Sequence, residues 1–213
     1  MTLSYLHSIP MFAFFLCIIL LIILFFEWPT LMPVPTGKFF LISLIYPIMP
    51  FFLLMHLTYR FYYDSIWLPL YPFIIAWSAD TFGYLVGKNW GRHKMCPTLS
   101  PGKSWEGFAG SFFGVMIANL LVIPKITAAP FNQFNSLWAI MGRQNGWLLF
   151  GALSLLQTIL AFLGGAFISK LKRLSGQKDS GIILPGHGGF LDRFDSVLST
   201  VILVWFIAMA ASI

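Results

Sequence analysis

Residues 11–26 read MFAFFLCIILLIILFF, a run without any Asp, Glu, Lys or Arg. At a rise of about 1.5 Å per residue, such a run and its neutral neighbours can cross about 30 Å of hydrocarbon as a helix. A membrane barrel would show a different, alternating ten-residue pattern. The run also lacks the basic segment of a signal peptide, so we expect a retained transmembrane helix.

The whole chain shares this apolar character. Of its 213 residues, 58% are hydrophobic and 9% are charged, and its mean hydropathy is +0.83. A soluble domain carries about 25% charged residues, which is far more than this chain has to cover a surface. The composition excludes a disordered protein, a secreted disulfide scaffold and an ordinary cytosolic enzyme. It predicts an all-α, polytopic membrane protein that forms one domain over residues 1–213.

Neutral segments of spanning length recur along the chain, and of these only 65–87 carries a charge, Asp80. We therefore expect an integral membrane helical bundle of about six transmembrane helices. The neutral segment 126–142 contains Pro, Asn and Gln, which favour a loop or re-entrant piece over a seventh span. The expected helices are 10–27, 39–58, 65–86, 105–124, 146–169 and 196–213.

The net charge of +6 has a membrane explanation and does not indicate a nucleic-acid partner. With six spans, the first, third and fifth loops share one side and hold most of the basic residues. The positive-inside rule places that side in the cytoplasm. The basic side holds Lys38, Lys88, Arg92, Lys94, Lys103, Lys170, Lys172, Arg173, Lys178 and Arg193, and the other side holds Arg60, Lys125 and Arg143.

Asp80 lies near the end of the third expected helix. A carboxylate inside a membrane is costly unless it has a partner or lines a watery cavity, so it indicates a functional site. The alternative is a structural ion pair with Lys88.

The stretch SPGKSWEG, residues 100–107, comes just before the fourth expected helix. Its Ser100, Gly102, Lys103 and Ser104 suit a phosphate bound at a helix N-terminus, although the Walker pattern is not met. The same residues also suit a plain helix cap, with Ser104 as the capping residue. Both interpretations can hold together.

A second polar cluster, residues 169–195, reads SKLKRLSGQKDSGIILPGHGGFLDRFD. If the last helix begins near residue 191, Asp192 and Asp195 share one face, and with Asp179 they suit a hard divalent cation. The glycine-rich turn 185–189 lets the backbone approach a ligand closely. A solvated basic connector is the alternative, but the three acids favour a metal-phosphate site.

These residues resemble the signature of the phosphatidate cytidylyltransferases, also called CDP-diacylglycerol synthases. Segments 80–84 and 100–107 resemble the same family, and the resemblance covers residues 75–213. Upstream of that region only Glu27 and Trp28 match. The signature positions are Ser169, Leu171, Lys172, Arg173, Lys178, Asp179, Gly181, Pro185, His187, Gly188, Gly189, Asp192, Arg193, Phe194 and Asp195.

The resemblance implies an enzyme of phospholipid biosynthesis that transfers CMP from CTP to phosphatidic acid, giving CDP-diacylglycerol and pyrophosphate. It implies a place in the cytoplasmic membrane of a bacterium-like cell, with the bilayer, the two substrates and a second copy of the chain as partners. Residues 76–213 would be the catalytic portion, with the signature at 169–195. Residues 1–75 would be N-terminal helices, short relative to the family.

The resemblance also implies roles for single residues. The Mg²⁺ ligands would be Asp192, Asp195 and Asp80, and a second cation is left open. The catalytic group would be Asp179, Lys178 and His187, with a structural turn as the alternative role of His187. Substrate phosphates would contact Lys103, Ser104, Ser100, Lys172, Arg173, Arg193, Gly188 and Gly189.

Two other functions remain open. A CTP-dependent polyprenol or lipid kinase would transfer the γ-phosphoryl group and release CDP. A non-enzymatic transporter or scaffold would use Asp80 for proton coupling. Against the transporter, most charges gather in two loops, and the sequence shows no inverted repeat.

Overall fold

In the computed structural model, the regular elements of the described residues are helices and one short hairpin, which confirms the all-α membrane fold. It describes residues 4–31, 41–42, 44–61, 67–97, 100–127, 146–181, 183 and 188–211. Its elements are α1 (Ser4–Ile22), the π-helical turn η1 (Ile23–Glu27), α2 (Trp28–Leu31), η2 (Leu44–Ile48), α4 (Met49–Phe61), α5 (Trp67–Trp90), β1 (Lys94–Cys96), β2 (Ser100–Ser104), α6 (Trp105–Thr127), α8 (Gly146–Leu174) and α9 (Leu191–Ala211).

Four helical stretches are long and apolar enough to cross a membrane: Met11–Leu31, Trp105–Ile126, Gly146–Leu174 and Leu191–Ala210. They correspond to four of the predicted spans. The other two coincide with α4, which has 13 residues, and with α5, which is rich in Trp, Tyr and Pro. The number six therefore stays a prediction, and the segment 126–142 lies outside the described residues from 128 onward.

Several helices run farther than predicted, and three of them do so at the polar clusters. The structure ends α5 at residue 90 instead of 86, ends α8 at 174 instead of 169, and begins α9 at 191 instead of 196. The predicted ends were set by the nearest charges, but charged residues are tolerated on the polar turns of a helix. Lys172 and Arg173, for example, lie in the last turn of α8, where cations favour the helix dipole. The polar clusters therefore lie partly on helix ends, in defined orientations.

The second predicted helix, 39–58, is interrupted. Tyr46 has an extended backbone (φ −148°, ψ 105°), and the regular helix α4 follows only from Met49. Tyr46 precedes Pro47, whose ring disfavours the helical conformation of the residue before it. The interruption directs the Tyr46 hydroxyl to the backbone carbonyl of Asp195 at 2.7 Å.

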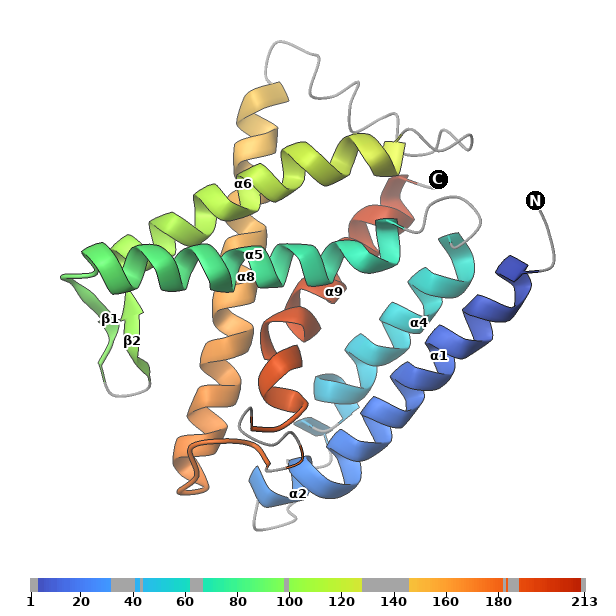
Figure 1. Ribbon diagram of the computed structural model, residues 1–213, viewed down its shortest axis with the longest axis horizontal. Helices are drawn as coiled ribbons and strands as arrows, with labels where there is room; N and C mark the ends of the chain where they lie inside the picture. The colour runs from blue at the N-terminus through green and yellow to red at the C-terminus, as the bar shows by residue number, and fades with distance from the viewer. Residues whose placement is uncertain are drawn as a thin grey trace.

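Helices α5 and α6 lie antiparallel, side by side, and cross α8 steeply (Figure 1). Glycines allow their close approach, because a Cβ added to Gly107 would lie 2.9 Å from the Gly83 carbonyl oxygen. A Cβ on Gly110 would lie 2.6 Å from the Val86 side chain. Small residues at membrane helix contacts let two backbones come together in this way. The contact brings the hairpin and the start of α6 next to Asp80.

A closed ring of buried hydrogen bonds ties α5, α6 and α8 together. The Tyr71 hydroxyl donates to Asn119 Oδ1 at 2.6 Å and accepts from Gln157 Nε2 at 2.9 Å. Asn119 Nδ2 donates to Gln157 Oε1 at 2.8 Å and to the Ser154 hydroxyl at 2.9 Å. Satisfied buried polar groups of this kind stabilise one arrangement of the three helices.

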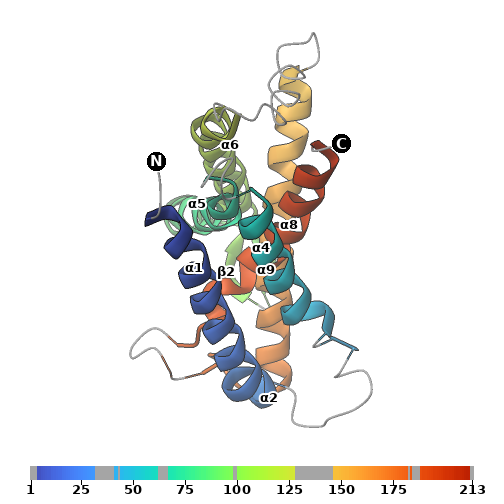
Figure 2. The same ribbon diagram turned by 90° about the vertical axis from the view of Figure 1, so that its right-hand side faces the viewer.

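The N-terminal helix packs beside α4 on the other side of the molecule (Figures 1 and 2). The core there contains Trp28, Phe51, Ile168 and Leu191, each almost fully buried. This core brings the end of η1, far away in sequence, against the first residues of α9.

Candidate active site

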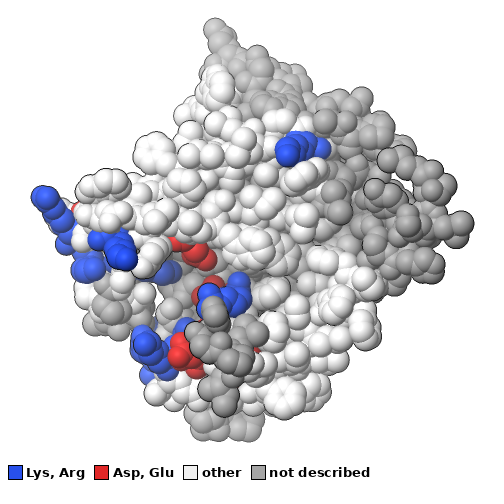
Figure 3. Space-filling view, in the orientation of Figure 1, with Lys and Arg blue, Asp and Glu red and all other residues white. Residues whose placement is uncertain are grey.

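Charged side chains gather in one part of the molecule. On the face drawn in Figure 3 they surround a hollow toward the hairpin end, while most of the remaining surface is uncharged. The two polar regions of the sequence, 80–106 and 169–195, meet in this part of the fold. The described parts of loops three and five therefore lie together, and the cytoplasmic side that the charge distribution predicts for them stays a prediction.

The centre of this region is a group that we call the Lys103 cluster: Asp80, Lys103, Asp195 and Ser196. The Ser196 hydroxyl donates to Asp80 Oδ1 at 3.4 Å, and the Ser196 N–H donates to Asp195 Oδ1 at 2.6 Å. A Cβ added to Gly165 of α8 would lie 3.1 Å from Lys103 Nζ and 3.5 Å from Asp195 Oδ2. Side chains from α5, β2 and α9 thus come together beside Gly165, where α8 carries no side chain.

Lys103 is partly withdrawn from water. Its ammonium donates to the Phe162 carbonyl at 3.3 Å and lies 4.4 Å from the centre of the Phe162 ring. Burial lowers the pKa of the Lys103 ammonium below that of an ordinary lysine, and the nearby carboxylates of Asp195 and Asp80 oppose that shift. The cluster therefore holds the Lys103 side chain near two acids in a confined space.

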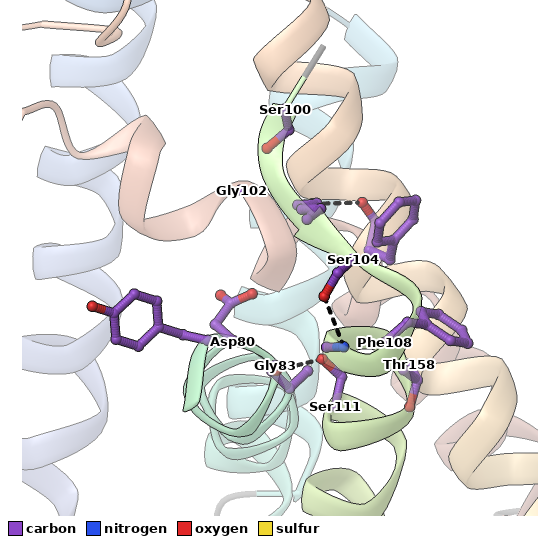
Figure 4. A pocket seen from close by; sticks show the side chains of 13 residues that line it. Asp80, Gly83, Ser100, Gly102, Ser104, Phe108, Ser111 and Thr158 are labelled. Atoms are coloured by element: carbon purple, nitrogen blue, oxygen red, sulfur yellow. Dashed lines mark hydrogen bonds between the residues drawn. The ribbon is translucent and has the colours of Figure 1, made fainter. Parts of the chain in front are cut away.

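A cavity of about 250 Å³ adjoins the cluster. Figure 4 shows Asp80 beside it on α5, and Ser100, Gly102 and Ser104 following one another along β2. Phe108 of α6 and Thr158 of α8 also line the cavity. A small polar group that enters it from the hairpin side meets Lys103 and Asp80 together. The cavity is lined by Ala79, Asp80, Gly83, Tyr84, Ser100, Gly102, Lys103, Ser104, Gly107, Phe108, Ser111, Thr158 and Phe162.

Ser104 caps α6, as the sequence predicted. Its hydroxyl accepts the Gly107 N–H at 3.1 Å. Glu106 in the first turn accepts the His93 N–H at 3.2 Å and lies 2.6 Å from His93 Nδ1, which fixes the hairpin to the helix. The other predicted role, contact with a phosphate, stays a prediction for Ser100, Gly102 and Ser104.

The alternative role of Asp80, a structural ion pair with Lys88, is not what the described residues show. Lys88 lies over the ring of Tyr84, with Nζ 5.6 Å from the ring centre, and Asp80 instead meets Ser196 and faces Lys103. Asp80 is thus part of the polar site and not of a surface ion pair along α5.

A second group, which we call the Asp192 cluster, consists of Glu27, Lys172, Ser180 and Asp192. Asp192 Oδ1 accepts from Lys172 Nζ at 2.7 Å. Its Oδ2 accepts the N–H groups of Ser180 at 2.8 Å and Gly189 at 3.1 Å. The Ser180 hydroxyl lies 3.0 Å from Asp192 Oδ2 and 3.2 Å from Glu27 Oε2. Both carboxylates are thereby engaged by protein donors.

The structure thus divides the three residues predicted as metal ligands. Asp80 and Asp195 come together around Ser196, whereas the oxygens of Asp192 face Lys172, Ser180 and Gly189. Among the described residues, no group of three His, Cys, Asp or Glu side chains is arranged to hold a metal. Mg²⁺ needs only one or two carboxylates when waters and substrate phosphates complete its shell. Asp80 and Asp195 fit that requirement.

Other predicted site residues belong to neither of the two named clusters. Lys178, Asp179 and Arg173 are exposed, and so is Arg193 on the first turn of α9. Gly188 has φ +80°, a conformation that favours glycine, and a Cβ there would lie 2.9 Å from Asp192 Oδ2. Gly189 contacts the Asp192 cluster, and His187 lies outside the described residues.

Sequence analysis did not predict Glu27, Ser180, Ser196 or Gly165 as parts of the site. Glu27 had a usable signal, because it is the first acid in the chain and ends a long apolar run. An acid inside a membrane segment indicates function by the same rule that identified Asp80. Ser196 and Gly165 carried no such signal, since serine and glycine are common in membrane helices.

An apolar groove of about 330 Å³ lies on the other side of the Gly164–Gly165 stretch. It reaches the Lys103 cluster through Gly164, because a Cβ there would contact the Asp195 carbonyl oxygen. Tyr46, which donates to that same oxygen, also lines the groove. The groove is formed by Ile42, Ile45, Tyr46, Leu163, Gly164, Phe167, Ser199 and Ile202.

Known proteins share this sequence pattern. The model of the cytidylyltransferase family matches residues 1–211. A phosphatidate cytidylyltransferase of Staphylococcus aureus is 43% identical over 129 residues, which cover 61% of this chain and 44% of that protein. One of Haemophilus influenzae is 38% identical over 141 residues, covering 65% and 44%. The uncharacterized protein YnbB of Escherichia coli is 41% identical over 133 residues, covering 62% and 39%. The chain thus matches less than half the length of these relatives.

Proposed function

The chain belongs to the cytidylyltransferase family, and on that premise we propose that it is a phosphatidate cytidylyltransferase. A phosphate oxygen of phosphatidic acid attacks the α-phosphorus of CTP. The bond from that phosphorus to the bridging oxygen of the β-phosphate breaks, and pyrophosphate leaves. The product is CDP-diacylglycerol.

The Lys103 cluster is the observation that carries the proposal. The phosphate nucleophile needs no activated serine or cysteine, so the task of the protein is to bring two anionic groups together and stabilise the charge on the leaving pyrophosphate. A confined ammonium between two carboxylates, beside a cavity lined by a hairpin, suits that task. Lys103 would contact a phosphate of CTP, and Ser100 and Ser104 would orient it.

Asp80 and Asp195 would hold Mg²⁺ in the proposed enzyme, with waters and phosphate oxygens as its remaining ligands. When bound, the cation would neutralise charge on the phosphates and align them. In this proposal Asp192 binds no metal, because protein donors already engage its oxygens. The exposed cationic side chains of Lys178 and Arg173 would guide the anionic nucleotide from the cytoplasm.

The lipid would approach from the membrane side. The apolar groove between η2, α8 and α9 ends at the backbone of Asp195, so we assign an acyl chain of phosphatidic acid to it. The headgroup phosphate would then lie near Gly165, with the nucleotide on the opposite side of the Lys103 cluster. The lipid would thus enter from the membrane and the nucleotide from the aqueous side.

The experiment is an assay of the purified protein in detergent with phosphatidic acid, Mg²⁺ and CTP labelled at the α-phosphorus. Label in the lipid and release of pyrophosphate are expected. Release of CDP with label absent from the lipid would indicate the lipid kinase instead. Neither product, under conditions where a related enzyme is active, would contradict an enzymatic role.

A further inference from the structure

Glu27 is a fully buried acid that the proposed reaction does not use. Its exposed fraction is 0%, and it ends the π-helical turn η1 in the N-terminal helix. A buried carboxylate is costly unless hydrogen bonds compensate its lost hydration. Single π-helical turns in α-helices are also frequent at functional sites.

The donors that compensate Glu27 all come from the signature region. Glu27 Oε1 accepts the Phe190 N–H at 2.7 Å, and Oε2 accepts the Leu191 N–H at 2.7 Å. The Ser180 hydroxyl lies 3.2 Å from Oε2. Glu27 thus joins the loop after α8 to the beginning of α9.

Among the residues that the structure describes, no neighbouring side chain caps the start of α9. Phe190 occupies the capping position, where its carbonyl accepts from Arg193 and Phe194, and its side chain has no acceptor. Glu27 supplies the missing acceptors from 163 residues away, at the positive end of the helix dipole. The helix start therefore depends on the N-terminal segment.

Position 189 has room only for a glycine next to the Glu27 carboxylate. A Cβ on Gly189 would lie 2.8 Å from Glu27 Cδ and from Oε1, so any larger residue would displace the carboxylate. The glycine that resembled a phosphate-binding position thus makes room for Glu27.

We propose that Glu27 is a positioning residue of the cytidylyltransferase site. By capping α9 and engaging Ser180, it sets where the first turn of α9 begins, and so where Asp192 and Asp195 point. The proposal rests on the function proposed above for its activity readout. It gives the N-terminal helix a role in the site beyond membrane anchoring.

The test compares the wild type with Glu27→Gln and Glu27→Asp. The glutamine variant keeps the shape but turns an NH₂ group toward a backbone N–H, which removes one acceptor. We expect kcat to fall by about tenfold to a hundredfold, as for a misplacement of about 1 Å, with unchanged KM for both substrates. Glu27→Asp keeps the acid and should recover part of the activity.

Asn119→Ala is the matched control, because it removes an equally buried polar residue from a ring whose hydrogen bonds join α5, α6 and α8. At a similar loss of thermal midpoint, its kcat per folded molecule should match the wild type. Equal kcat losses in Asn119→Ala and Glu27→Gln, or a wild-type kcat in Glu27→Gln, would overturn the proposal. So would a change confined to KM for phosphatidic acid.

Hydrogen exchange separates this proposal from the proposed function. Glu27→Gln should accelerate amide exchange over residues 189–195, whereas Asn119→Ala should not. If the wild type does not transfer CMP but this difference appears, the positioning role stands and the proposed function fails. Unchanged exchange in Glu27→Gln refutes the positioning role whatever the activity.

Discussion

The Lys103 cluster and the Asp192 cluster draw on two acids near the start of α9, three residues apart, yet they use them differently. Asp192 has both oxygens engaged by Lys172, Ser180 and Gly189. Asp195 accepts one short bond from its neighbour Ser196, and its second oxygen faces the space above Gly165. One cluster is saturated by the protein, and the other is open beside a cavity.

This difference indicates two roles, fold stability for the Asp192 cluster and ligand binding for the Lys103 cluster. A saturated carboxylate with an ammonium partner stabilises a fold, and breaking it leaves buried groups without partners. An open pair of carboxylates beside a confined ammonium is costly for the fold and useful for a ligand. The expected effects on turnover and on stability should therefore diverge between the two clusters.

Asp195→Asn should have the largest effect on turnover. Removing one preorganised charged group from a phosphoryl-transfer site costs about 100-fold to 1,000-fold in kcat. The thermal midpoint should stay near that of the wild type, because asparagine has the same shape and keeps an acceptor for Ser196. Transfer of α-labelled CMP and a melting curve in detergent measure the two quantities. Near-wild-type turnover would remove Asp195 from the reaction.

Lys103→Ala should follow, with a loss of about 100-fold in kcat/KM for CTP. Lys103→Arg should recover only part of it, since a guanidinium is larger and planar and the space above Gly165 is narrow. Lys88→Ala is the control, because that lysine lies over Tyr84 away from the cluster. If both alanine variants lose activity equally, general charge attraction would explain the effect and not a defined site.

Asp192→Asn should act mainly on stability. It removes the charge that pairs with the largely buried Lys172, at an expected cost of about 1–3 kcal/mol in free energy of unfolding. Combining it with Lys172→Met should give less than the sum of the two single losses, because the residues contact each other. Additive losses would show that the 2.7 Å ion pair contributes little.

The sequence predicted an all-α membrane fold, one shared side for the two polar regions and the capping role of Ser104, because charge-free runs, the distribution of basic residues and local spacing indicate them. It did not separate Asp192 from Asp195, since their three-residue spacing puts both on one face and only the contacts from α8 and from the loop that follows it distinguish them. The hairpin was missed because SPGKS reads as a loop when its partner strand has only three residues. Glu27 was missed because its partners lie more than 150 residues away.

The smallest effect is expected from a substitution in the apolar groove that leaves the side chains of both clusters in place. Ile202→Trp should fill part of the 330 Å³ groove and leave the Lys103 cluster in place. Changes in the size of an apolar pocket alter discrimination by about tenfold at the low end, so kcat/KM should fall by about tenfold for phosphatidic acid with long chains and change little for short chains. The KM for CTP should not change. Phe206→Trp, at an exposed position of α9 outside the groove, is the control. An equal loss for all chain lengths would place the acyl chain elsewhere and leave the two clusters as the only defined parts of the site.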